Sequence, residues 1–205
     1  MAPVIQTYKN TGNNLFMFIN DSSFDIWPFA AKLEKYDACT YLHSLNVAKI
    51  SLSIGRVFNL SDQQLVNLAI CAFLHDIGKT LMPIQIINKP GILTAMEYNF
   101  VKSHSIIGGE YLKHNSVFDK EVLTGVMHHH EKFDGSGYPN GLMNNEIPFF
   151  SRIVSIADVY DAVTSLRPYR KPVSPTAALD LIMYEMKSAF DKQIIGVLSS
   201  VINLK

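Results

Sequence analysis

The sequence is short of the features that mark secreted, nucleic-acid-binding and membrane proteins. Its 205 residues include two cysteines, Cys39 and Cys71, too few for a disulfide framework, which favours a reducing compartment. Lysine plus arginine (18) equal aspartate plus glutamate (18), so no surplus charge predicts binding to duplex nucleic acid or to a membrane surface. The longest apolar runs fall well short of the roughly 20 residues of a transmembrane helix, and no signal peptide is recognisable. We therefore expect a cytoplasmic protein that does not engage a membrane.

Internal repeats, low-complexity tracts and Gly/Ser linkers are also lacking. The length suits one domain with a sizeable core. Residues 1–35 contain scattered aromatic residues and turn clusters, whereas the pattern from there on is helical. We expect an N-terminal extension or the remnant of a preceding module in this segment. Residues 36–205 would form the main domain. Strand-like alternation is scarce, and only 83–87 ("PIQII") is a candidate extended run. The pattern predicts an all-α fold.

Helical periodicity brings polar side chains onto apolar stripes. Ser61 and Gln64 have the form of a capping box, and the apolar face that follows ends at His75 and Asp76. His43 stands four residues before a valine on the stripe of an earlier helix. These polar residues are expected to point into the core.

A second capping-box pattern is formed by Thr94 and Glu97. The stripe expected on that helix has a histidine in its middle and consists of Met96, Phe100, His104, Ile107 and Tyr111. His104 would therefore also face the core.

Two further helical segments place histidine and aspartate beside apolar residues. In the segment starting near Asp119, continuing the apolar face brings in His129 and His130, whereas His128 falls on the polar side. In a later segment Asp158 lies at the margin of the stripe.

Five histidines and two aspartates would thus meet in one core: His43, His75, Asp76, His104, His129, His130 and Asp158. Burying one unpaired polar group costs about 2 to 7 kcal/mol, and domain stability is only about 5 to 15 kcal/mol. A metal site removes this conflict, because imidazole and carboxylate ligands are satisfied through the cation. An aspartate next to a histidine suits a two-metal arrangement in which one carboxylate bridges both ions. Imidazole-rich sites with carboxylates suit iron, manganese or zinc better than calcium or magnesium.

Each motif also has a plainer interpretation. A single histidine on an apolar stripe is more often a hydrogen-bonded core residue, and the run at 128–130 could be a solvated helix end. The stretch 134–141 ("DGSGYPNG") could be only a multiple turn. The coincidence of spacing across all the segments favours the metal site.

Three long motifs, in order, resemble one known family. They are "HDIGK" (75–79), "HHEKFDGSGYPNGL" (129–142) and "RIVSIADVYDAVTSLRPYR" (152–170), with the fitting stretch 88–108 between the first two. Together they resemble the HD-GYP domain, a subgroup of the HD phosphohydrolases, over about residues 36–192. The resemblance implies an all-α helical bundle with a central metal site. It further implies a metal-dependent phosphodiesterase that hydrolyses cyclic di-GMP, a bacterial second messenger, to linear pGpG and often to GMP.

The resemblance assigns the metal ligands in two sets that share Asp76. One set matches His43, His75, Asp76 and Asp158, and the other matches Asp76, His104, His129 and His130. Two divalent ions, iron or manganese, are implied. Some members bind a third ion through a glutamate, but Cys39 occupies that position here, so we favour two ions.

Four residues match the family's catalytic and substrate-binding positions. Besides the bridging Asp76, Lys79 is implied in catalysis and in contact with the scissile phosphate. Tyr138 matches the tyrosine beside the substrate, and Arg167 and Arg170 match phosphate-gripping positions, a task that suits the planar arginine fork. Metal-activated water would attack phosphorus in line. For two further carboxylates, we expect Glu131 to orient a ligand and Asp134 to cap the glycine loop.

Two other functions stay open from the motifs. Nothing in them reads the base, so another cyclic dinucleotide, such as cyclic GMP-AMP, is an alternative substrate. A different class is a non-catalytic receptor or adaptor that binds cyclic di-GMP or a partner protein. The expected partners are cyclic di-GMP itself, a diguanylate cyclase or a response regulator, and a second copy of the chain as a homodimer.

Overall fold

The computed structural model describes residues 15–19, 25–115, 118–166 and 171–203. Within these ranges the chain is helical, and the β structure is an isolated bridge between Asp134 and Met143. The all-α prediction is therefore confirmed. A helical segment covers 15–19, and the following elements are α2 (Trp27–Tyr36), α3 (Ala38–Val57), α4 (Asp62–Leu74), η1 (Ile77–Leu81), α5 (Ile84–Ile87), α6 (Ala95–Lys102), α7 (His104–Asn115), α8 (Lys120–Met127), η2 (Asn144–Glu146), α9 (Phe149–Thr164), α10 (Pro175–Asp180), η3 (Leu181–Glu185) and α11 (Lys192–Asn203).

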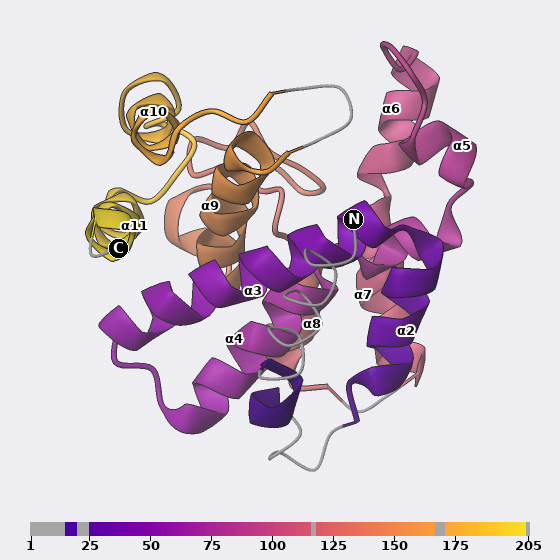
Figure 1. The fold of residues 1–205 in the computed structure, drawn as a ribbon, viewed down its shortest axis with the longest axis horizontal. Coiled ribbons are helices and arrows are strands. Elements are labelled where there is room, and N and C mark those ends of the chain that lie inside the picture. The colour runs from indigo at the N-terminus through magenta and orange to yellow at the C-terminus, as the bar shows by residue number, and fades with distance from the viewer. Residues whose placement is uncertain (1–14, 20–24, 116–117, 167–170, 204–205) are drawn as a thin grey trace.

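The core lies between the central helices. The long helix α3 packs along α4 and α9, and α4 also packs on α8 (Figure 1). Leu45, Phe73 and Ile153, from α3, α4 and α9, are fully buried. Complete burial of such a side chain stabilises the fold by about 1.5–3 kcal/mol, so these helices form a firm frame. Within the described ranges, every helix is too short or too polar to span a bilayer.

Both capping boxes form as the sequence predicts. The Ser61 hydroxyl accepts from Gln64 N (3.3 Å), and Gln64 Oε1 accepts from Ser61 N (3.1 Å), at the start of α4. At the start of α6, Thr94 Oγ1 accepts from Glu97 N (3.2 Å), and Glu97 Oε2 accepts from Thr94 N (2.8 Å). Each box satisfies backbone donors that the first helical turn leaves free.

The run at 83–87 is helical, so its prediction as an extended segment is wrong. Ile84–Ile87 forms the single turn α5, in which Ile87 N donates to Pro83 O and Asn88 N donates to Ile84 O. An isolated strand would leave its ladder groups unpaired, and the described chain offers no strand for it to join. A helical turn satisfies these groups locally.

The stripe predicted across residues 96–111 is broken. Helix α6 ends at Lys102, Ser103 N donates to Phe100 O, and α7 begins afresh at His104. Met96 is 83% exposed and Phe100 is 40% exposed, whereas His104 is buried. The turn at Ser103 separates the two helices, and the two halves of the pattern do not share a buried face.

Candidate metal centre

The seven side chains that the sequence singled out gather where α4 ends. They come from α3, the turn after α4, the start of α7, the turn after α8, and α9. Two groups of ligand atoms could hold a metal ion, each with its atoms within 4.8 Å of one another, and Asp76 belongs to both. The groups are His43, His75 and Asp76, and Asp76, His104, His129 and His130. Asp158 lies beside them, with Oδ1 at 3.0 Å from His43 Nε2 and Oδ2 at 4.0 Å from His130 Nδ1.

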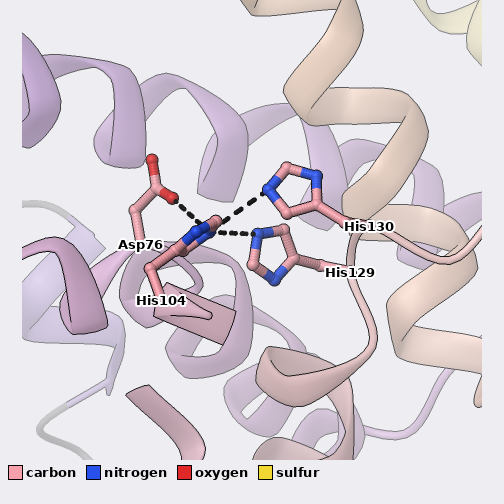
Figure 2. A group of neighbouring side chains, drawn as sticks. All are labelled: Asp76, His104, His129 and His130. Carbon is pink, nitrogen blue, oxygen red and sulfur yellow. Dashed lines mark hydrogen bonds and ion pairs between the residues drawn. The ribbon is translucent and has the colours of Figure 1, made fainter. Parts of the chain in front are cut away.

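Three imidazoles and a carboxylate converge in the second group (Figure 2). The Nε2 atom of His104 is 3.3 Å from Nε2 of His129 and 3.2 Å from Nε2 of His130. The same atom is 3.2 Å from Asp76 Oδ1. Four potential ligand atoms therefore point at one small region.

The other ring nitrogens show which tautomer these histidines adopt. Three Nδ1 atoms lie within hydrogen-bond distance of the carbonyl oxygen three residues earlier: His75 on Ala72 (2.7 Å), His104 on Val101 (2.7 Å) and His129 on Val126 (2.6 Å). A carbonyl oxygen only accepts, so each Nδ1 carries the proton. In the neutral ring Nε2 then presents a lone pair, which is the form that binds metal.

These lone pairs cannot satisfy one another. His75 Nε2 and Asp76 Oδ1 are buried without a hydrogen-bond partner among the residues that the structure describes. Burial holds the pKa of His129 well below its usual value. Burial likewise lowers the pKa of His130 to about 3. Neutral acceptors facing a carboxylate leave several kcal/mol of desolvation uncompensated. A divalent cation fits this donor set, because it accepts every one of the lone pairs.

The His43 side of the centre has a different chemistry. His43 Nε2 faces Asp158, and its Nδ1 lies 2.6 Å from Oδ2 of Asp161. Burial lowers the pKa of His43, but hydrogen bonds to these two carboxylates outweigh it and raise that pKa to about 9. The His43 ring projects from α3 and is held between two carboxylates on successive turns of α9.

The aspartate shared by both groups is also paired with Lys79. The Lys79 ammonium lies 2.6 Å from Asp76 Oδ2, and His75 Nε2 lies 3.4 Å from the same oxygen. Burial would raise the pKa of Asp76, but the positive charge of Lys79 holds it well below its usual value. Asp76 is therefore an anion at neutral pH.

The glycine of "HDIGK" lets this segment reach the centre. Gly78 lies in η1 against the start of α7, where a Cβ would be too close to the His104 carbonyl oxygen and to Gly108 N. Only a residue without a side chain permits this backbone contact. The approach brings Asp76 and His104 within reach of each other.

The loop that carries the Gly-Tyr-Pro motif is held by hydrogen bonds to Glu131, the residue that follows the histidine pair His129 and His130. Glu131 is 2% exposed, and its carboxylate oxygens accept from Asn140 N (2.7 Å) and Leu142 N (3.0 Å). A Cβ on Gly137 would meet the backbone of residues 130–132. Glu131 thus anchors the loop and makes no hydrogen bond to a ligand side chain. Asp134 caps the loop as expected, accepting from Ser136 N (3.0 Å).

Tyr138 reaches the centre from this loop. Its ring lies 4.7 Å from the His130 ring, measured between centroids. Lys102 Nζ lies over the rings of Tyr138 (5.2 Å) and Tyr98 (5.1 Å). We call α6 and the loop 131–143 the rim. An aromatic face and a cation therefore lie beside the histidine pair.

The other residues predicted for the site lie apart or outside the described chain. Helix α8 ends at Met127, so the prediction that it continues through His129 and His130 is wrong; His128 caps it, and the pair lies in the turn that follows. His128 donates to Thr124 O, lies 3.2 Å from the Asn140 amide nitrogen and belongs to neither ligand group. Cys39 is exposed and belongs to neither ligand group. Arg167 and Arg170 lie outside the described residues.

A model of the HD domain family matches residues 26–194 of the chain. The chain belongs to the HD domain family. This confirms the resemblance drawn from the motifs, and HD domains bind divalent metals, in agreement with the cluster of histidine and aspartate side chains.

Curated relatives of this HD domain share about a third of its residues. A cyclic di-GMP phosphodiesterase of Pseudomonas aeruginosa is 37% identical over 163 residues, which cover 80% of this chain and 39% of the relative. The cyclic di-GMP phosphodiesterase of Thermotoga maritima is 37% identical over 166 residues, 80% of this chain and 45% of the relative. A 3'3'-cGAMP-specific phosphodiesterase of Vibrio cholerae is 35% identical, covering 79% and 35%. The chain thus spans less than half the length of these relatives.

Solved structures share the fold of this HD domain. An HDG"Y"P protein of Bdellovibrio bacteriovorus superimposes with a TM-score of 0.70 at 20% identity, over 97% of this chain and 64% of that one. The HD domain of the phosphodiesterase PgpH of L. monocytogenes, in complex with cyclic-di-AMP, gives a TM-score of 0.64 at 21% identity, over 85% and 93%.

Two residues of the site, Asp161 at the centre and Lys102 on the rim, were missed from sequence. Asp161 follows Asp158 at a spacing of three, which places both on one face of α9, and this signal could have found it. Lys102 gave no comparable signal, because its contact with Tyr138 spans 36 residues.

Proposed function

We propose that this HD domain is a phosphodiesterase that hydrolyses cyclic di-GMP to linear pGpG and onward to GMP. The observation that carries the proposal is the convergence of unprotonated imidazole nitrogens on Asp76, with His75 Nε2 and Asp76 Oδ1 left unpartnered. The relatives named cyclic di-GMP phosphodiesterases support the choice of substrate. We further propose two ions, iron or manganese, one in each ligand group, with Asp158 completing the His43 group.

The surrounding residues have the chemistry that such a reaction requires. Divalent ions in these groups would supply acidification of water and neutralisation of phosphate charge at neutral pH. Asp76 is an anion that belongs to both groups, and Lys79 places an ammonium beside it, which would offset negative charge on a phosphate. Tyr138 offers an aromatic face against which a base or ribose could lie. Arg167 and Arg170 are proposed phosphate contacts on the family resemblance.

The direct test is turnover of cyclic di-GMP by the purified, manganese-loaded chain. We expect pGpG or GMP as product, and we expect Asp76→Ala to lower kcat at least about 1,000-fold, as loss of a central catalytic group typically does. His128→Ala is the matched control, since that neighbouring histidine belongs to neither ligand group. Unchanged turnover in Asp76→Ala would sink the mechanism, and binding of cyclic di-GMP without turnover in the wild type would favour a receptor.

A second substrate has specific support. Three relatives, 30–35% identical, are named 3'3'-cGAMP-specific phosphodiesterases. Competition between cyclic di-GMP and 3'3'-cGAMP in one reaction gives the ratio of kcat/KM values directly. We expect cyclic di-GMP to be consumed first, and a ratio in favour of 3'3'-cGAMP would reassign the substrate.

The setting and the partners are proposals of the same kind. Both cysteines, Cys39 and Cys71, are free, which supports a reducing, cytoplasmic compartment. A diguanylate cyclase, a response regulator or a second copy of the chain is proposed as a partner. One relative, from Xanthomonas campestris, is itself named a cyclic di-GMP phosphodiesterase response regulator.

A further inference from the structure

The histidines of the centre differ in what orients them. His75, His104 and His129 each donate from Nδ1 to a backbone carbonyl of the preceding turn. His43 instead directs Nδ1 to a carboxylate oxygen, Asp161 Oδ2, at 2.6 Å. A carbonyl fixes the orientation of the ring. A carboxylate fixes the orientation and also adds a full negative charge behind the ring, which makes Nε2 a stronger metal ligand.

Both carboxylate oxygens of Asp161 have partners that hold it against His43. Its side chain is buried, and its second oxygen accepts from Ser165 Oγ at 2.7 Å, from the residue that caps the C-terminal end of α9. Asp158 lies one turn earlier on the same helix face and approaches the opposite nitrogen of His43 at 3.0 Å. Helix α9 therefore presents two carboxylates to the two nitrogens of one ring.

The charge around the two ligand groups is consequently unequal. Asp76 belongs to both groups, so the positive charge of Lys79, which is paired with Asp76, affects the electrostatics of both. Asp158 lies nearer to the His43 group, at 3.0 Å from His43 Nε2 against 4.0 Å from His130 Nδ1. The carboxylate of Asp161 contacts His43 and none of the imidazoles of the other group among the described residues. In a site of low dielectric, each nearby carboxylate attracts a divalent cation strongly.

We propose that Asp161 is a positioning residue that makes the His43 group the tighter of two metal positions, leaving the His104 group as the weaker one. The inference rests on the two-metal centre of the proposed function and deepens it. The ion in the His104 group is then the one that exchanges with the solution. Occupancy of the His104 group would then follow the free metal concentration.

Manganese titration of the full chain tests the inference without any assay of activity. After dialysis against a chelator, free Mn²⁺ is followed by electron paramagnetic resonance during titration at fixed pH. We expect two classes of site in the wild type. Asp161→Asn keeps an oxygen for His43 and removes only the charge, so it should weaken the tighter class by about 10- to 100-fold and leave the weaker class unchanged. His104→Ala should do the reverse.

Two controls separate positioning from a structural role. Ser165→Ala removes the hydroxyl that donates to Asp161 but keeps the carboxylate charge, so the tighter class should weaken by less than in Asp161→Asn, and the weaker class should stay unchanged. The melting temperature of each metal-free variant shows whether the fold has loosened. Equal weakening of both classes by Asp161→Asn, or a single class in the wild type, would overturn the inference. Two intact classes without turnover of cyclic di-GMP would instead contradict only the proposed function.

Discussion

The metal centre and the rim lie side by side but are held in place by different means. His75 and His129 at the centre are fully buried, and their rings are tied to the backbone of the helices that precede them. The rim has α6, which buries none of its residues, and a loop tied down through the Glu131 carboxylate. Ligand geometry therefore depends on the core, whereas the surface around Tyr138 depends on a few polar contacts.

This difference separates the expected effects of mutation. A change that displaces the frame of the centre should lower both metal content and the free energy of unfolding. A change confined to the rim should leave metal content intact and act on the KM for cyclic di-GMP, because the rim carries the proposed substrate contacts. The following experiments test this separation. A rim variant that lost metal, or a variant of the centre that kept its full metal content, would contradict it.

The largest effect is expected from Gly78→Ala. The added methyl would push η1 away from the His104 carbonyl, so the free energy of unfolding should fall by about 1–3 kcal/mol. Bound manganese should fall below one ion per chain, measured by elemental analysis. Gly196→Ala is the matched control, because a Cβ there meets nothing, and it should raise helix stability by up to about 1 kcal/mol. Full metal content in Gly78→Ala would contradict the role of this contact.

Glu131→Gln should release the loop of the rim. The variant keeps the shape of the side chain but offers an amide nitrogen to one of two backbone donors, which costs about 1–3 kcal/mol. We expect the KM for cyclic di-GMP to rise about tenfold with both metal ions retained. Glu146→Gln, on an exposed carboxylate of the same region, should change little. Loss of metal from Glu131→Gln would show that the loop and the centre are not separable.

A smaller change is expected from Lys102→Met. The substitution nearly keeps the length of the side chain and removes the cation over Tyr98 and Tyr138. Each of these cation–π contacts contributes about 0.5–1 kcal/mol. The KM should rise about two- to fivefold with kcat and metal content unchanged. Lys32→Met removes a similar contact, over Tyr111, and should leave KM at the wild-type value. Equal effects of both variants would remove Lys102 from the rim's function.

The smallest effect concerns the pH response of α6. Hydrogen bonds from Lys89 and Thr94 lower the pKa of Glu97 to about 2. Its stabilisation is therefore present above the ordinary pKa near 4.5 and is lost as pH falls through 2. Glu97→Gln should speed amide exchange in α6 at pH 7 and leave α4 unchanged, measured by mass spectrometry. Equal protection of α6 in both proteins would show that the pair contributes nothing, as is common for exposed ion pairs.

Local patterns predicted much of this fold and of the site. The capping boxes at Ser61 and Thr94, the end of α4 at "HDIGK" and the separation of His128 from its two neighbours follow from spacings within one or two turns. The break at Ser103 did not follow, because periodicity continues across it while the chain turns. The turn of helix at Ile84 was missed because an apolar run without partners suits either structure.

By itself, the sequence determined that helices would bring histidine and aspartate into one core, because the 3.6-residue period assigns each side chain a face. Motifs of the HD family named the same residues. Only the tertiary structure decided which partners stand behind them. His43 meets Asp161 across 118 residues, and Glu131 rather than a metal ligand holds the loop. Such pairings depend on how distant helices pack, and no local spacing records that packing.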